Sequence, residues 1–241
     1  MLEKTKGIIL HQIKYTDSGI VAQVYTREFG RRSFLIKGLR NKKSGKHNIL
    51  FQPLFILDMV FYNKESCAIQ MLKEFSVSFA PTDIYCDVKK SCIAIFLGEI
   101  LNSVLREESP HKEMFDYIEN SIIYFEGSKT GYINFHIAFL TGLSAFLGFE
   151  PGQRTDHRNV YFDMLNGTFV PAPPLHGSYT DAEISDILSV FFKTSYDNMN
   201  NITLTGALRN EVLETIVKYY SLHLPGLKKI NSLGVLKEIF S

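Results

Sequence analysis

The sequence predicts an α+β protein with more than one domain: a small β-barrel at the N-terminus and a mostly helical region after it. Five short strand patterns separated by turn signals fill the first 80 residues. Beyond Pro81 the apolar spacing becomes helical, and a Pro/Gly-rich stretch later interrupts the helices. We therefore expect domains at residues 1–80 and 81–241, with an irregular hairpin insertion at 152–179.

The strand patterns of the first domain are bounded by polar turns and broken once by Pro53. Strands of this length at this spacing are typical of a small antiparallel barrel, which leaves no open sheet edge. The expected strands are residues 6–14, 20–26, 31–37, 50–62 and 68–77.

Helical spacing dominates the second domain, and the pattern at 131–147 is apolar on all sides, which indicates a buried helix. A capping-box pattern from Thr180 to Glu183 predicts the start of another helix. The insertion contains two short strand patterns around the turn 165–167. The expected helices are residues 88–105, 112–125, 131–147, about 183–192, 205–222 and 232–239.

Composition excludes several classes of protein. The sequence has no run of eighteen apolar residues, and its first apolar stretch, 7–14, is too short for a signal peptide. Three cysteines without paired spacing fit a reducing, cytoplasmic setting. Zinc ligands normally come in close pairs, so we expect no metal and no cofactor. No nucleotide-binding or hydrolase motif occurs, and we expect no enzyme activity.

Charge is divided unequally along the chain. Residues 1–80 carry thirteen Lys or Arg and six Asp or Glu, whereas residues 81–241 carry thirteen and nineteen. The positive excess peaks at 27–46, with Glu28 the one acid there. A cluster of this kind favours a polyanion, and nucleic acid is the commonest. A solvated, lysine-rich loop is the alternative interpretation.

We predict a nucleic-acid site on and after the third strand, in which cations hold phosphates and aromatic rings stack on bases. Phe34 fits the barrel core equally well. The candidate phosphate contacts are Arg31, Arg32, Lys37, Arg40, Lys42, Lys43 and Lys46, and the candidate stacking residues are Tyr25 and Phe29.

The front of the chain resembles a known family. The pieces that carry the resemblance are Tyr25-Thr-Arg-Glu-Phe-Gly30, Lys37-Gly-Leu-Arg40, a basic linker with Ser44, and Leu50-Phe-Gln-Pro53. Their order and spacing are similar to those of the bacterial recombination mediator RecO. Residues 139–151 and 219–236 resemble the family's central and C-terminal helices.

The resemblance implies an oligonucleotide-binding (OB) barrel followed by a helical domain. It also implies a cytoplasmic, nucleoid-associated protein that binds single- and double-stranded DNA and promotes annealing. Its implied partners are RecR and the C-terminal tail of single-strand binding protein (SSB), and it would help load RecA onto SSB-coated DNA during recombination and repair. Many relatives carry four zinc-binding cysteines in the segment that corresponds to 152–176. This sequence has none there.

Two other functions stay open. The protein would be an interaction adaptor with weak DNA contact if its acidic helical body carried the function. It would be a nuclease or phosphotransferase if carboxylates clustered around a metal ion.

Overall fold

The computed structural model describes residues 1–16, 19–37, 48–64, 66–107, 109–158 and 160–240. The chain divides into two compact units, Met1–Gly127 and Ser128–Ser241. The barrel ends at Phe79, near the predicted domain boundary, and the next three helices belong to the same unit as the barrel. The two units are described separately.

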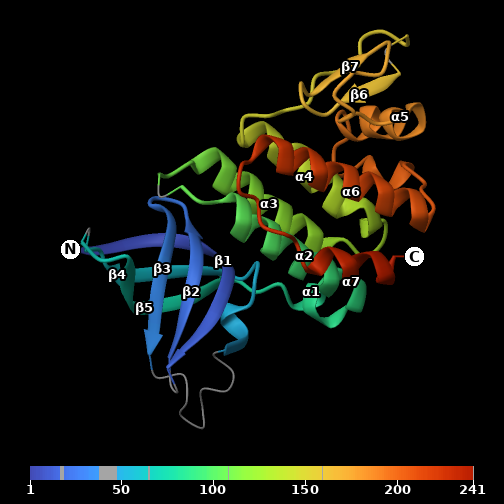
Figure 1. Ribbon diagram of the computed structural model, residues 1–241. Helices are drawn as coiled ribbons and strands as arrows, with labels where there is room; N and C mark the ends of the chain where they lie inside the picture. The colour runs from blue at the N-terminus through green and yellow to red at the C-terminus, as the bar shows by residue number, and fades with distance from the viewer. Residues whose placement is uncertain (17–18, 38–47, 65, 108, 159, 241) are drawn as a thin grey trace. The chain divides into compact units, whose positions relative to one another are not determined.

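Five strands form a closed barrel in the order β1-β2-β3-β5-β4 (Figure 1, blue to teal). This agrees with the five strands expected from the sequence and with an OB-like fold. The strands are β1 (Leu2–Thr16), β2 (Gly19–Thr26), β3 (Gly30–Lys37), β4 (Ile56–Tyr62) and β5 (Ile69–Phe79).

One strand pair differs from the expected antiparallel arrangement. β3 and β5 pair in parallel, with Ser33 opposite Ile69 and Leu35 opposite Met71. All other neighbours in the ring are antiparallel. The reason is geometric, because strand direction cannot alternate all the way around a closed ring with an odd number of strands.

The predicted strand at 50–62 is shorter in the structure. Residues Asn48–Phe51 form the 3₁₀ helix η1, and β4 begins only at Ile56. Pro53 has no N–H to donate to a strand ladder. Leu54 adopts a left-handed conformation, with φ of 67°, which ends any extended run.

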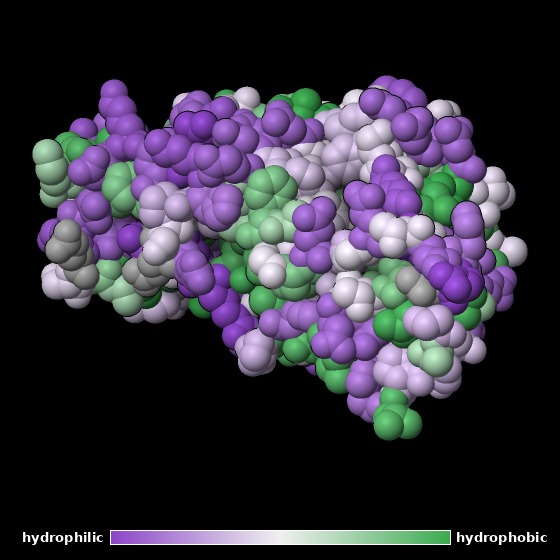
Figure 2. All heavy atoms as spheres, turned by 90° about the horizontal axis from the view of Figure 1, so that it is seen from above, coloured by the Kyte–Doolittle hydropathy of each residue, from purple (hydrophilic) through white to green (hydrophobic). Residues whose placement is uncertain are grey.

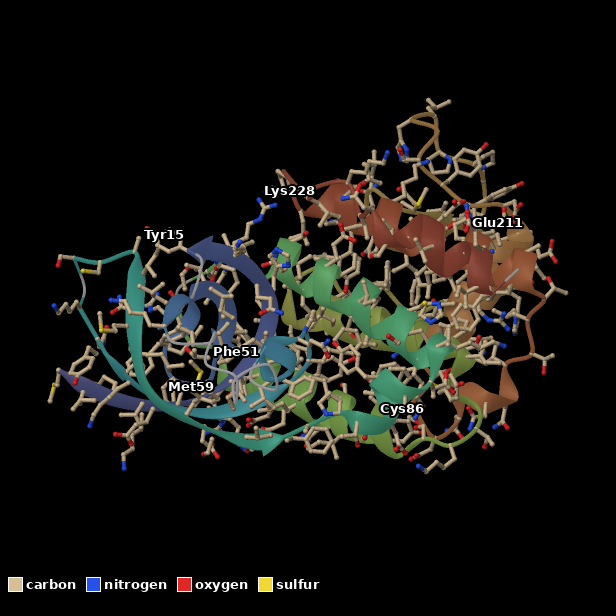
Figure 3. The ribbon with its side chains drawn as sticks, turned by 90° about the horizontal axis from the view of Figure 1, so that it is seen from below. Tyr15, Phe51, Met59, Cys86, Glu211 and Lys228 are labelled. Carbon is tan, nitrogen blue, oxygen red and sulfur yellow. The ribbon has the colours of Figure 1, made fainter. Side chains whose placement is uncertain are left out.

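The barrel interior is apolar and tightly packed. Phe34 is fully buried there, so the core interpretation of this residue is the correct one. Figure 3 shows Phe51 and Met59 within the ring of strands, and both belong to the same core. Gly7 has no room for a side chain, since a Cβ there would lie 2.5 Å from Val24 Cγ1.

Three helices complete the first unit: α1 (Thr82–Cys86), α2 (Val88–Val104) and α3 (Lys112–Gly127). Lys90 is buried, and its ammonium donates hydrogen bonds to the carbonyls of Phe125 and Glu126 at the end of α3. The Glu126 carboxylate accepts from the backbone N–H groups of Asp83 and Ile84 at the start of α1. Charged groups thus satisfy two helix ends.

The second unit follows the predicted order of helices and hairpin. Its elements are η2 (Tyr132–Asn134), α4 (Phe135–Phe146), β6 (Tyr161–Asp163), β7 (Thr168–Val170), α5 (Ala182–Phe191), η3 (Met199–Asn201), α6 (Gly206–His223) and α7 (Ser232–Ile239). The cap of α5 is shifted by one residue from the predicted capping box. Asp181, not Thr180, accepts from the Ile184 N–H, while Thr180 bonds to the Ser185 hydroxyl.

A small lobe at residues 152–179 contains the hairpin β6–β7. Phe162 and Phe169 lie in this hairpin, with ring centroids 5.0 Å apart. Both pack against Phe192, and Phe162 also packs against Tyr219 of α6, at centroid distances of 5.2–6.1 Å. Gly167 has φ of 64°, and a Cβ there would lie 2.7 Å from the Tyr219 hydroxyl. Aromatic packing therefore holds the lobe to its helices.

Asp163 forms a polar centre in the lobe. Its buried carboxylate accepts hydrogen bonds from the Leu165 and Asn166 N–H groups and the Asn166 amide, and it lies 3.2 Å from His176 Nε2. Burial alone raises the pKa of Asp163. The hydrogen bonds, those of Asn166 first, outweigh burial and hold the pKa below its usual value.

The surface is mixed in character. Figure 2 shows one face, on which hydrophilic side chains predominate and apolar atoms emerge in small groups. Among the described residues, no helix has both the length and the apolar character needed to span a membrane.

Replacing Asp163 by Asn is expected to lower the free energy of unfolding at neutral pH by about 1–3 kcal/mol, because buried N–H donors lose a charged acceptor. A lowered folded-state pKa contributes stability above the ordinary carboxyl pKa and loses it as pH falls. The difference between wild type and Asp163→Asn should therefore shrink from pH 7 to pH 3. Urea unfolding followed by circular dichroism measures it, and a difference that stays constant would contradict this role.

Candidate nucleic-acid interface

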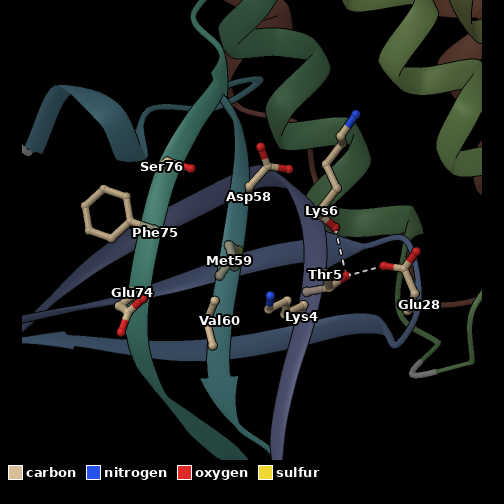
Figure 4. Close-up of a pocket in the computed structure, with 10 residues that line it drawn as sticks. All are labelled: Lys4, Thr5, Lys6, Glu28, Asp58, Met59, Val60, Glu74, Phe75 and Ser76. Carbon is tan, nitrogen blue, oxygen red and sulfur yellow. Dashed lines mark hydrogen bonds between the residues drawn. The ribbon is translucent and has the colours of Figure 1, made fainter.

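Two hollows open on the barrel unit, and the first has mixed charge. It encloses about 560 Å³ beside β1, β4 and β5 (Figure 4). Lys4 and Lys6 face it together with three acidic residues, Glu28, Asp58 and Glu74. Alternating charge of this kind provides no single-signed surface for a polyanion.

The second hollow, which we call the arginine pocket, encloses about 730 Å³. It is formed by β2, β3, the turn between β4 and β5, and the residue after Leu105, where α2 is capped. Its described lining includes Arg31, Arg32 and Arg106 and no acidic residue. A polar hollow that gathers the positive charge of three arginines is suited to an anion such as phosphate.

Arg31 fixes one wall of the arginine pocket. Its Nη1 donates to the carbonyls of Asn102 and Leu105 at 2.6 and 2.9 Å, and its Nη2 donates to Asn102 Oδ1 at 2.9 Å. These are carbonyls at the end of α2, which carry partial negative charge and have no partner within the helix. Burial, and then the positive charge of Arg106, lower the pKa of Arg31.

The opposite wall is a turn built around Gln70. Its side chain is buried and forms three hydrogen bonds: it accepts from Lys64 N–H and donates to the carbonyls of Lys64 and Cys67. Gln23 on β2 accepts from the Ser33 hydroxyl at 3.1 Å on the pocket's inner side. Hydrogen bonds therefore fix the positions of both glutamines that line the pocket.

The structure brings three predicted site residues together. Arg31, Arg32 and Phe29 all line the arginine pocket, although the Phe29 ring also packs edge-on against Phe61 in the core at 5.3 Å. Lys37 is exposed at the end of β3. The remaining predicted cations, Arg40, Lys42, Lys43 and Lys46, lie outside the described residues.

Tyr25 does not lie where a base could stack on it. Its side chain is 2 % exposed, and its ring packs against Phe115 of α3 with centroids 6.0 Å apart. Its hydroxyl lies 3.5 Å from the His111 carbonyl, and burial raises its pKa well above the usual value. Tyr25 joins the barrel to α3, and we leave it out of the interface.

Arg106 was not predicted from the sequence. Arg106 follows Leu105, the cap of α2, and precedes Glu107-Glu108. A charged run in this position is typical of a solvated helix end. Two contacts of Arg31 place Arg106 beside β3. The guanidinium bonds to carbonyls at the end of α2, and the backbone N–H donates to the Glu107 carbonyl at 3.0 Å. Asn63, Gln23 and Gln70 also line the pocket, and no local sequence pattern marks them as site residues.

Other basic residues of the barrel are neutralised by α3. Lys6 Nζ lies 2.8 Å from Glu119 Oε1, and Arg27 forms two hydrogen bonds with the Asp116 carboxylate, at 2.9 and 3.0 Å. The Asp116 pair raises the pKa of Arg27 and lowers that of Asp116. These contacts distinguish cations that pair with carboxylates of α3 from Arg31, whose guanidinium donates to carbonyl oxygens at the end of α2.

Comparison with known proteins agrees with this architecture. The family model for Recombination protein O N terminal matches residues 1–78, and that for Recombination protein O C terminal matches residues 86–232. The chain belongs to the RecO family. Curated relatives named DNA repair protein RecO include those of Bacteroides fragilis (39 % identical) and Phocaeicola vulgatus (37 %), each matched over the whole of both chains. The relative from Flavobacterium psychrophilum is 32 % identical over 99 % of each chain.

The resemblance to the family raised the question of a zinc site in residues 152–176, and the residues present do not fit one. The corresponding segment has no cysteine, and aromatic rings and the Asp163 hydrogen bonds hold it instead. Among the described residues, no group of three or more His, Cys, Asp or Glu side chains is placed to hold a metal ion. The described side chains between residues 152 and 179 thus offer no close set of zinc donors.

Replacing Arg31 by Met is expected to lower the free energy of unfolding by about 1.5–3 kcal/mol, because the carbonyls at the end of α2 lose charged donors. Lys37→Met on the same strand is the control, and its exposed side chain should cost about 0.5 kcal/mol or less. Urea unfolding measures both. Equal effects of the two substitutions would show that Arg31 does not stabilise the end of α2.

A metal chelator is expected to leave the thermal unfolding midpoint unchanged, since no zinc contributes to the folding free energy of the lobe. The matched control is a four-cysteine relative, whose midpoint should fall under the same treatment. Stoichiometric zinc in the purified protein, measured by mass spectrometry, would refute the assignment.

Proposed function

We propose that this protein is a non-enzymatic DNA repair and recombination mediator that binds single- and double-stranded DNA and promotes strand annealing. The observation that carries the proposal is the arginine pocket on the barrel of a RecO-family chain. Strands 2 and 3 and the loop between strands 4 and 5 form the ligand-binding region of OB barrels. The arginine pocket is built from the same elements.

The proposed mechanism is electrostatic. Arg31, Arg32 and Arg106 provide the described part of a phosphate-binding surface, and Lys37 is a further exposed cation at the end of β3. The cations predicted at residues 40–46 would add to this surface. Neutralising phosphates on two strands lowers their mutual repulsion, which favours annealing. The contacts involve no base edges, so binding should depend little on sequence.

Partners complete the proposal. As for the family it resembles, we infer that the protein works with RecR and the C-terminal tail of SSB, and so helps load a recombinase onto SSB-coated DNA. The excess of acidic residues after residue 80 suits protein contacts better than DNA contacts. A pure adaptor, the second candidate, would use those contacts and bind DNA only weakly.

The double variant Arg32→Gln/Arg106→Gln is expected to weaken binding of single- and double-stranded oligonucleotides of every sequence. If both side chains contact phosphate, the slope of log K against log salt should fall by about 1.4–1.8. Fluorescence anisotropy over a salt series measures it. Lys193→Gln/Lys218→Gln, which removes the same charge from exposed positions after α5 and within α6, is the control and should keep the wild-type slope.

The same anisotropy experiment is repeated with the triple variant Arg40→Glu/Lys42→Glu/Lys43→Glu. We expect this variant also to bind oligonucleotides more weakly. Annealing of complementary strands by the purified protein alone separates a mediator from an adaptor. Unchanged affinity in both variants, together with no annealing, would overturn the proposal in favour of the adaptor.

A further inference from the structure

An unbroken row of apolar side chains crosses the outside of the barrel. Leu2 on β1 is paired with Tyr62 on β4, and Tyr62 is paired with Met71 on β5. Ile69 lies two residues before Met71, on the same face of β5. Phe61 and Gln70, the chain neighbours of these residues, are buried, which confirms that the row points outward. We call these four residues the outer row.

The outer row is exposed to an unusual degree. Its four side chains are each 40–47 % accessible. Isolated apolar residues on a surface are ordinary, but apolar side chains that adjoin across three strands mark an interaction surface. Leu35 extends the row onto β3, because it is paired with Met71 in the parallel ladder.

The outer row is continuous with the arginine pocket. Ile69 is paired with Ser33, which lines the pocket, and it lies between two further lining residues, Ala68 and Gln70. Tyr62 immediately precedes Asn63, which also lines the pocket. The two ends of the turn between β4 and β5 therefore connect an anion-binding hollow to an apolar surface.

Exposed lysines border the outer row. Lys4 follows Leu2 at a spacing of two residues and so shares its face of the sheet, and Lys37 stands in the same relation to Leu35. The ligand that fits these surfaces has flat apolar groups joined by a chain of anions.

We propose that the outer row contacts the unpaired bases of a single-stranded nucleic acid whose phosphates lie in the arginine pocket. This inference rests on the proposed function and adds a preference for strand state to it. Tyr62 presents an aromatic ring for stacking, and Met71 and Ile69 present adaptable apolar surface. These positions replace Tyr25, whose ring is buried.

The preference of the outer row for single-stranded DNA follows from which groups each kind of DNA exposes. In a duplex the base faces are stacked on one another, and a protein surface meets only phosphates, sugars and groove edges. A single strand can turn its bases onto an apolar surface while its phosphates stay on cations. The arginine pocket should therefore serve both kinds of DNA, and the outer row only one.

A peptide with acidic and apolar residues is the competing ligand. It would match the row and the bordering lysines, but it gives no reason for three arginines in a continuous hollow without an acidic residue in its described lining. The nucleic acid uses both surfaces at once, and for this reason we favour it.

The test compares affinities for a labelled single-stranded oligonucleotide and for the matching duplex. Tyr62→Ala/Met71→Ala should weaken single-strand binding by about 5-fold to 150-fold, the range for loss of one base stack, and change duplex binding less than 2-fold. Tyr62→Phe should bind as the wild type does. Val88→Ala/Ile95→Ala, at exposed positions on α2, is the matched control. Thermal unfolding of each variant verifies that it is folded.

A second readout places 2-aminopurine in the single strand. Binding of the wild-type protein should change the fluorescence of the 2-aminopurine. Binding of the Tyr62→Ala/Met71→Ala variant should not. Equal loss of single-strand and duplex binding in that variant, or no loss of either, overturns the inference. Either outcome leaves the proposed function intact if Arg32→Gln/Arg106→Gln still weakens both single-strand and duplex binding. Loss of binding to an acidic, phenylalanine-containing peptide with unchanged DNA binding would instead assign the row to a protein partner.

Discussion

The contact of Arg31 with the end of α2 determines how the candidate interface is assembled. A helix leaves its last carbonyls without partners, and the guanidinium supplies charged donors to two of them. The same contact joins β3 of the barrel to α2, and it fixes where the chain leaves that helix. Arg106 follows these carbonyls in the chain, and a backbone hydrogen bond from the Arg31 N–H to the Glu107 carbonyl holds the same segment beside β3. A residue that stabilises the fold thus also sets the spacing of the cations that are proposed to bind phosphate.

The basic residues of the barrel fall into two groups with different partners. Lys6 and Arg27 form ion pairs with carboxylates of α3, which lower the charge that these positions present to a ligand. In the arginine pocket, burial and then the positive charge of another cation, Arg106, lower the pKa of Arg31. Like charges held close together favour an anion between them. The net charge of the first 80 residues does not show which cations belong to which group. The packing of α3 shows it, because its carboxylates pair with Lys6 and Arg27.

Most of the fold could be predicted from the sequence because it rests on periodicity and turn chemistry. The strands, the buried helix and the hairpin around Gly167 all follow from local patterns. What could not be predicted depends on contacts between distant segments. The ring closure through β3 and β5 is one example, and the burial of Tyr25 under α3 is another. An aromatic residue in a strand looks the same whether a helix covers it or solvent does.

The candidate site shows the same division. The density of positive charge along the sequence identified β3 as part of the candidate site, because cations that are close in sequence are also close in space. It could not identify Arg106, about 75 residues away, nor the outer row, whose members come from three strands and are ordinary apolar residues in sequence. A barrel makes such sites from alternate residues of neighbouring strands, so neither half of the site is contiguous in the chain. The phosphate-binding and base-binding surfaces can therefore vary independently, because a substitution on the outer face of β4 or β5 leaves the Arg31 contact with α2 intact.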